Sequence, residues 1–149
     1  SKSEVMKREA TLEELDFEID DNTIAFNTKV AGIDSYLYFI FRDGKLYHAE
    51  YRLVELYPDY SGYITDYNKL NRLLTKKYGD PVKFDPRDLE KTLATSKDTT
   101  SFISEWETEK SDITLTFKVD EMAVITILAY QNNKEMAQEE LDEFYMEDL

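Results

Sequence analysis

The chain has 149 residues, 42% of them apolar and 34% charged, and its formal net charge is -14 at pH 7. A domain of this length can bury one core without a disulfide or a metal ion, and the apolar content argues against a disordered chain. The negative charge disfavours nucleic acids and anionic membranes as partners, and the absence of cysteine excludes disulfides, cysteine metal sites and a thiol nucleophile.

Acidic residues are concentrated in residues 1–23, 105–121 and 134–149, whereas residues 24–104 are close to neutral. This uneven charge would attract a basic protein partner. No apolar run approaches the ~18 residues of a membrane-spanning helix, so no direct membrane span is predicted.

The N-terminal part predicts a short helix and then a hairpin. Hydroxyl residues stand ahead of an acidic residue in the opening SKSEVM, which is typical of a helix start, and we expect this helix to run to about Glu9. From Leu15 to Ile19 apolar residues alternate with acidic ones, residues 20–22 form a turn, and the alternation resumes at Ile24. The two alternating runs predict a first antiparallel hairpin.

The stretch FRDGKLYHAEY, residues 41–51, predicts a second hairpin. Asp43 and Gly44 stand between two strand-like runs, and both central positions of a type I′ turn need the positive φ that such a pair tolerates. With a two-residue loop, Ile40 faces Tyr47; with a type I turn and a bulge, the pairs slip by one residue. The sequence leaves the register of this hairpin open.

Two helices are predicted after this hairpin. Apolar and aromatic residues recur at helical spacing from Tyr63 to Tyr78, and Gly79 is typical of a helix end. A cap residue and an early proline within residues 85–88 predict a second, short helix that runs to about Leu93.

Three strands and a last helix complete the chain. Residues 102–108, 112–119 and 123–130 have strand-like patterns, and Trp106 is expected to anchor the buried face of their sheet. The tail from Lys134 has apolar residues on one side and acidic residues on the other, which predicts an amphipathic acidic helix.

These elements predict a single α+β domain over residues 1–149, with antiparallel meander sheets and packed helices in the order helix-strands-helix-strands-helix. Hairpins and meanders, in place of β-α-β crossovers, indicate antiparallel pairing. A helix followed by a meander occurs twice in this order. The order is therefore compatible with an internal duplication, although no sequence repeat supports it.

Three stretches together resemble small bacterial envelope proteins and lipoproteins: SKSEVMKRE, FIFRDGKLYHAEYRL and LLTKKYGDP, the last followed by a tryptophan strand and the strand ITLTF. The layout of helix plus meander is similar to the small lipoprotein modules of the outer-membrane assembly machinery and to the β-lactamase inhibitor protein. The resemblance implies a non-enzymatic interaction or scaffold domain outside the cytoplasm, and it carries over no lipid anchor because the chain has no lipobox cysteine. We expect an extracytoplasmic protein, secreted or lipid-anchored before truncation. Ser1 at the start fits a chain from which a signal or anchor was removed; a cytoplasmic location is the alternative.

No catalytic residue, metal site or cofactor is predicted. His48 is the only histidine, and we interpret it as a strand residue in a cross-strand pair instead of a proton shuttle, because no serine motif of a hydrolase accompanies it. Glu50 is the carboxylate to test first for catalysis, and an exposed strand glutamate is the simpler interpretation. Residues 20–22 and 85–90 lack the spacing of a calcium loop, and a lone histidine excludes a multi-histidine centre.

Tyrosine is unusually frequent, with 11 residues in the chain, and nine of them lie between Tyr36 and Tyr78. Most of them are expected where the helix packs on the sheet. The connection YPDYSGY differs, since three tyrosines beside proline and glycine cannot all lie in the core, and rigid aromatic loops are typical contact surfaces. We therefore predict a binding patch at Tyr57, Tyr60 and Tyr63.

The leading hypothesis is a non-catalytic binding domain of the bacterial envelope or a secreted one, with an unknown ligand and a preferentially basic protein partner. The oligomeric state is not indicated. The alternative is a cytoplasmic acidic inhibitor or nucleic-acid mimic that blocks a basic surface, because residues 105–109 place three glutamates on one strand. An enzyme with paired carboxylates is the third hypothesis.

Overall fold

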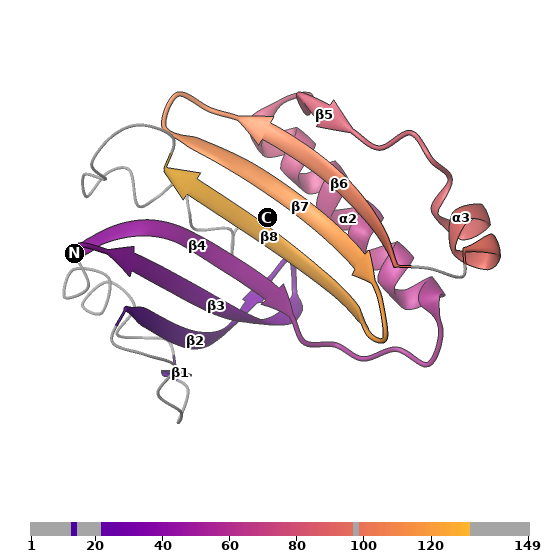
Figure 1. The fold of residues 1–149 in the computed structure, drawn as a ribbon, viewed down its shortest axis with the longest axis horizontal. Coiled ribbons are helices and arrows are strands. Elements are labelled where there is room, and N and C mark those ends of the chain that lie inside the picture. The colour runs from indigo at the N-terminus through magenta and orange to yellow at the C-terminus, as the bar shows by residue number, and fades with distance from the viewer. Residues whose placement is uncertain (1–12, 15–21, 97–98, 132–149) are drawn as a thin grey trace.

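Eight strands form one antiparallel sheet in the order β1-β2-β3-β4-β8-β7-β6-β5 (Figure 1). The structure is a computed structural model and describes residues 13–14, 22–96 and 99–131. The strands are β1 (Glu13–Glu14), β2 (Thr23–Val30), β3 (Ile33–Arg42), β4 (Lys45–Leu53), β5 (Lys83–Phe84), β6 (Thr100–Glu107), β7 (Ser111–Val119) and β8 (Ala123–Gln131), and the helices are α2 (Tyr60–Tyr78) and α3 (Leu89–Thr95).

Two meanders, β2-β3-β4 and β6-β7-β8, are joined into this sheet by the pairing of β4 with β8. The antiparallel sheet and the α+β character are confirmed. The expected order helix-strands-helix-strands-helix with separate meander sheets is wrong, because all described strands belong to one sheet and the described part contains only the helices α2 and α3. The pair of His48 with Tyr130 joins positions about 80 residues apart, and local patterns do not reveal such a contact.

The expected elements at the two ends lie outside the described residues: the helix to Glu9, the strand at residues 15–19 and the helix from Lys134. The internal duplication inferred from the alternating order loses its basis together with that order. By contrast, β6, β7 and β8 match the expected ranges closely, and Trp106 is buried in β6 as expected.

The hairpin of β3 and β4 closes through a two-residue turn in which Asp43 and Gly44 have positive φ angles of 53° and 75°. A bulge at Tyr47 follows, because Ile40 pairs with His48 instead of Tyr47. The predicted hairpin is therefore confirmed. Of the two forms that the sequence left open, the loop has two residues, whereas the pairs beyond the bulge are those of a register slipped by one residue. As a result, His48 lies on the face of the sheet opposite α2.

Helix α2 begins about one turn earlier than predicted and lies across one face of the sheet, in contact with β6, β7 and β8 (Figure 1). The carboxylate of Asp59 caps the helix and accepts a hydrogen bond from the N–H of Ser61, 2.9 Å away. At the other end, the N–H of Gly79 donates to the carbonyl of Thr75 at 2.9 Å, and the positive φ of 89° at Gly79 turns the chain out of the helix.

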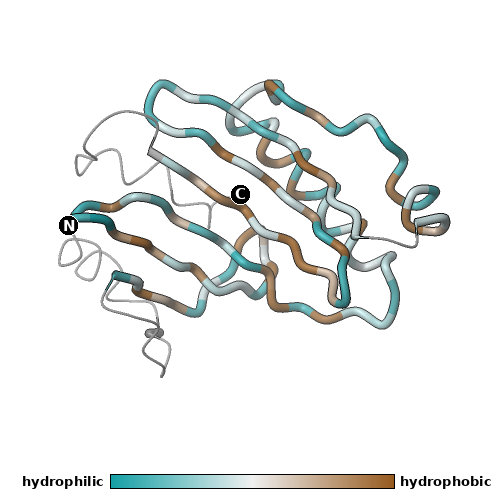
Figure 2. The backbone as a smooth tube through the Cα atoms, viewed as in Figure 1, coloured by the Kyte–Doolittle hydropathy of each residue, from teal (hydrophilic) through white to brown (hydrophobic). Residues whose placement is uncertain are grey.

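The core between α2 and the sheet combines aliphatic side chains, such as Leu70 and Leu74, with a cluster of aromatic rings. Phe117 of β7 lies at its centre, with its ring centroid 6.0 Å from that of Tyr63 and 5.9 Å from those of Tyr67 and Phe102. All four residues are buried. Apolar residues alternate with polar ones along the strands (Figure 2), as a sheet covered on one face requires.

The helix is also tied to the first meander. The Nζ atom of Lys69 donates a hydrogen bond to the carbonyl of Ala31, 2.8 Å away, in the turn between β2 and β3. Ala31 and Gly32 have positive φ angles of 52° and 79°, so this turn has the same two-residue form as the one at Asp43 and Gly44. One side chain of α2 thus connects the helix to the more distant hairpin.

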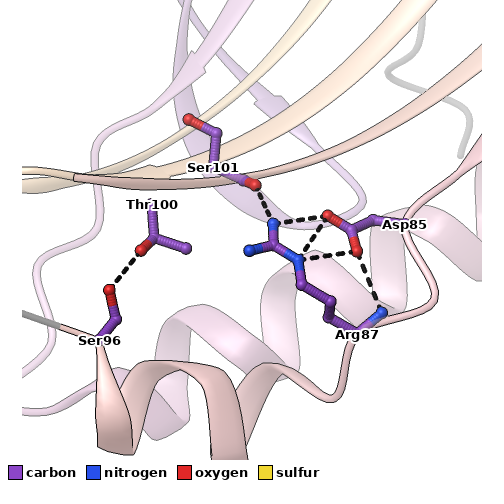
Figure 3. Close-up of polar contacts among 5 residues, drawn as sticks. All are labelled: Asp85, Arg87, Ser96, Thr100 and Ser101. Carbon is purple, nitrogen blue, oxygen red and sulfur yellow. Dashed lines mark hydrogen bonds and ion pairs between the residues drawn. The ribbon is translucent and has the colours of Figure 1, made fainter. Parts of the chain in front are cut away.

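Arg87 lies at the edge of β6, next to Ser101 (Figure 3). Its guanidinium binds both carboxylate oxygens of Asp85, at 2.7 to 3.2 Å, and donates to the carbonyl of Ser101 in β6. The guanidinium carbon lies 4.6 Å from the ring centroid of Phe102. β5 is only two residues long and leaves part of the β6 edge unpaired. Arg87 lies on that part of the edge and blocks pairing with another strand.

Replacing Phe117 with alanine should lower the free energy of unfolding by about 3–5 kcal/mol, because the change removes the ring that helix and sheet share and leaves a cavity. Urea unfolding followed by circular dichroism measures the loss. Lys118→Ala, at the next and exposed position of β7, is the matched control and should change the free energy by less than about 0.5 kcal/mol. A loss below about 1 kcal/mol for Phe117→Ala would contradict the central position of this ring.

Candidate functional site

The connection between β4 and α2 lies at one end of the sheet, beside the turn between β7 and β8 (Figure 1). A cavity of about 360 Å³ opens there, and we name it the apolar cavity. Its lining residues are Leu56, Tyr57, Pro58, Asp59, Tyr60, Tyr63, Glu121, Met122 and Ala123. The structure therefore brings all three tyrosines of the predicted binding patch to one cavity.

The three tyrosines differ in what they offer to a ligand. Tyr60 is 43% exposed and forms part of the accessible wall, whereas Tyr63 is 8% exposed and belongs to the core through its contact with Phe117. Tyr57 is half-buried. Tyr60 and Tyr63 lie in α2 and not in a loop, so the connection itself is shorter than the sequence indicated.

Tyr57 is fixed by contacts on several sides. Its ring lies against Gly62, where an added Cβ would come within 2.3 Å of a ring carbon, and its ring centroid is 5.0 Å from that of Tyr63 in an edge-to-face contact. The Tyr57 hydroxyl donates to the carboxylate of Asp66, 2.5 Å away. This hydrogen bond, followed by burial and the charge of Asp66, raises the pKa of Tyr57 to about 12. Tyr57 is therefore a rigid wall of the apolar cavity.

Leu56 and Met122 are the most exposed large apolar residues in the described part of the chain, at 75% and 70%, and both line the apolar cavity. Met122 is displayed in the β7–β8 turn, where the N–H of Asp120 donates to the carbonyl of Met122 at 3.1 Å. Sequence reasoning missed both residues. For Met122 the available signal was an apolar side chain in the acidic turn after β7, where no core contact is expected. Together with Tyr60 they form an exposed apolar patch of the kind that marks a contact surface.

A second cavity, of about 410 Å³, adjoins the first, and Tyr60 and Glu121 line both. We name it the polar cavity because hydroxyl and carboxylate groups make up much of its wall. Its lining residues are Tyr60, Leu93, Ser96, Thr99, Thr100, Val119, Asp120 and Glu121. The hydroxyls of Ser96 and Thr100 lie 2.6 Å apart and share a hydrogen bond (Figure 3). The sequence did not indicate this cavity, because α3, β6 and the β7–β8 turn meet only in the fold.

Negative charge accompanies both cavities. Asp59, Asp120 and Glu121 line them, and among the described residues no lysine or arginine does. The hydroxyl and the N–H of Ser61 donate to the Asp59 carboxylate and hold its pKa below the usual range. Asp59 is thus a fixed negative charge at neutral pH and is unsuited to act as an acid catalyst. A ligand at this site meets apolar walls beside carboxylates.

His48 lies away from these cavities, on the face of the sheet opposite α2. Its ring centroid is 5.3 Å from that of Tyr47 and 5.2 Å from that of Tyr130, and it pairs across the strands with Ile40 and Tyr130. Burial, and then the charge of Arg42, lower the pKa of His48, which favours the neutral imidazole. The interpretation of His48 as a strand residue in a cross-strand pair is confirmed.

Glu50 lies on the same sheet face as His48 and forms an ion pair with Arg52, with 3.0 Å between the carboxylate oxygen and the guanidinium nitrogen. Neither Glu50 nor His48 lines the apolar or the polar cavity. Over residues 13–14, 22–96 and 99–131, no three side chains of the kinds that ligate metals gather closely enough to hold an ion.

Comparison of the chain with models of protein families, with curated protein sequences and with solved structures found no match. The resemblance to envelope proteins therefore stays a prediction. Neither described helix combines the length and the apolar character needed to cross a lipid bilayer. The chemistry of the site rests on its own geometry, which offers apolar contact next to negative charge.

Gly62→Ala should destabilise the protein by about 1–3 kcal/mol, although alanine is the better helix former, because the added methyl group would overlap the Tyr57 ring. Chemical unfolding monitored by circular dichroism gives the difference. In a Tyr57→Ala background the same change should be neutral or stabilising, since the space is then free. A Gly62→Ala protein as stable as the parent would show that the ring moves aside at no cost.

The pKa of Tyr57 should fall from about 12 toward the ordinary value near 10 in Asp66→Asn, because that change removes the charged acceptor of its hydroxyl. NMR titration of the tyrosine Cζ resonances measures the shift. Asp80→Asn, an exposed carboxylate beyond the end of α2, is the control and should leave the pKa of Tyr57 unchanged.

The same pair predicts a pH dependence of stability. The pKa of Tyr57 is raised in the folded state, so its stabilising contribution is complete below about pH 10 and is lost as the pH rises toward 12. The decline of the unfolding free energy between pH 10 and pH 12 should be smaller in Asp66→Asn than in the parent. Equal declines in the two proteins would contradict the pairing.

Proposed function

We propose that the protein is a non-catalytic binding domain whose apolar cavity receives an apolar side chain of a protein partner. The observation that carries this proposal is the convergence of Leu56, Tyr60 and Met122 on one cavity although each is exposed to solvent. Exposed apolar side chains that surround a hollow leave water when a complementary side chain enters, and this burial favours association by roughly 25 cal/mol for each Å² removed from water.

The rigidity of the cavity supports the same proposal. Tyr57 is fixed by Gly62, Tyr63 and Asp66, and the Asp59 cap fixes the first turn of α2, which carries Tyr60. A wall that is already ordered loses little conformational entropy when a ligand binds. Preformed aromatic walls of this kind are typical of recognition sites.

The charge of the chain supports a basic partner. Three carboxylates line the two cavities, and the chain as a whole carries -14. Opposite charge on the partner would speed the encounter and orient it, whereas phosphate backbones and anionic lipids would be repelled. A protein segment with basic residues therefore fits the site better than a nucleic acid.

We also place the domain outside the cytoplasm, secreted or lipid-anchored, as part of this proposal. Its support is the resemblance of SKSEVMKRE, FIFRDGKLYHAEYRL and LLTKKYGDP to small envelope proteins. Fractionation of cells that express the full-length gene product tests the location. Recovery in the cytoplasm would contradict it and would favour an acidic inhibitor of a basic surface.

The binding proposal is tested with N-acetyl-tryptophanamide as an apolar probe of defined structure. Protein labelled with ¹³C at the methionine methyl groups should show a saturable shift of the Met122 signal, which Met122→Leu identifies by its loss. Leu56→Ser should weaken binding several-fold, because it removes one apolar wall of the cavity.

The matched control is Phe84→Ser. Phe84 is also a large exposed apolar residue, 62% accessible, but it lies in β5 at the far edge of the sheet. This change should leave the Met122 titration unchanged. If Phe84→Ser weakens the probe as much as Leu56→Ser does, or if Met122 does not respond to the probe, the apolar cavity is not the binding site.

A further inference from the structure

We infer that the polar cavity takes a lysine or arginine side chain of the same partner segment, so that the protein recognises an apolar residue and a basic residue two positions apart. This inference rests on the proposed function and adds a second element of recognition to it. The inferred partner is an extended protein segment that carries an apolar residue and a basic residue. An apolar surface without the basic residue would not meet this requirement.

The spacing follows from how the two cavities adjoin. Tyr60 and Glu121 line both cavities, so the two cavities share a wall. In an extended segment, residues i and i+2 point to the same side about 7 Å apart, and the residue between them points away. Positions i and i+2 are the nearest pair whose side chains point the same way, so this spacing suits two cavities that share a wall.

The chemistry of the polar cavity favours a basic side chain. The carboxylates of Asp120 and Glu121 can only accept hydrogen bonds at neutral pH, and an ammonium or guanidinium group can only donate them. Leu93 and Val119 in the same wall suit the methylene stem of a lysine or arginine, and the aromatic ring of Tyr60 lines the cavity as well, which suits a cation. An apolar stem with a charged tip matches this arrangement.

The same carboxylates repel a negatively charged side chain. A glutamate at the second position would bring a third carboxylate next to Asp120 and Glu121, and among the described residues no lysine or arginine lines the cavity to compensate. Repulsion of the wrong partner is as much a source of specificity as attraction of the right one. The inference therefore predicts a charge preference that apolar contact alone would not produce.

Three capped peptides test the inference on the full chain: Gly-Trp-Gly-Lys-Gly, and the same sequence with Glu or Gln in place of Lys. Each is also made with the Trp and the variable residue exchanged, because the direction of the segment is open. Binding is followed at the Met122 methyl signal at low ionic strength. The Lys peptide should bind at least about fivefold more tightly than the Glu peptide, with the Gln peptide between them.

The double variant Asp120→Asn/Glu121→Gln removes the charge and retains the shape of the cavity. In this variant the ratio of Lys to Glu peptide affinity should fall to nearly one, while the affinity of the Gln peptide stays the same. Asp80→Asn, a carboxylate that lines neither cavity, is the control and should retain the full preference. Added salt should reduce the preference in the parent protein as well.

The outcomes separate the inference from the proposed function. If all three peptides shift Met122 with equal affinity, the basic residue is wrong and the apolar site stands. If none of them shifts Met122, both are overturned. If Met122 shifts with protein concentration before any peptide is added, a second copy of the chain occupies the site, and the inferred partner is wrong.

Discussion

The contact of Phe117 with Tyr63, Tyr67 and Phe102 is the interaction on which the rest of the structure depends. It fixes α2 on the sheet, and because Tyr63 stands in the first turns of that helix, it also fixes the end of the helix that faces the β7–β8 turn. The walls of both cavities meet at this end. The same burial that stabilises the domain therefore places the site, and the site needs no separate scaffold.

Local features of the fold could be predicted from the sequence. The turn at Asp43 and Gly44 follows from residues that tolerate positive φ, and the end of α2 follows from Gly79. The register beyond the bulge at Tyr47 could not be predicted, because the alternation of side chains around it fits two registers equally well. The pairing of β4 with β8 could not be predicted for another reason: the paired residues lie about 80 positions apart, and the alternation along each strand does not indicate which strand is its neighbour.

The candidate site, too, could be predicted from the sequence only in part. Tyr57, Tyr60 and Tyr63 could be selected from the sequence because aromatic residues beside proline and glycine are unusual in a core. Their unequal exposure could not be predicted, because Ser61 and Gly62 look like helix breakers. In the structure both lie in the first turn of α2, where backbone N–H groups lack helical partners and Asp59 supplies one. Gly62 has a specific reason to lack a side chain, which is the Tyr57 ring against it.

The joining of the two meanders has a consequence for the order of events during synthesis. β4 leaves the ribosome about 80 residues before the part of β8 that pairs with it, which takes on the order of 4–16 s at ordinary rates of translation. During that time the nascent meander β2-β3-β4 presents an unpaired edge, a template for unwanted association. The charged side chains of Lys45, Glu50 and Arg52 on β4 disfavour such association until β8 has been synthesised. The last described strand is thus the one that completes the nascent sheet.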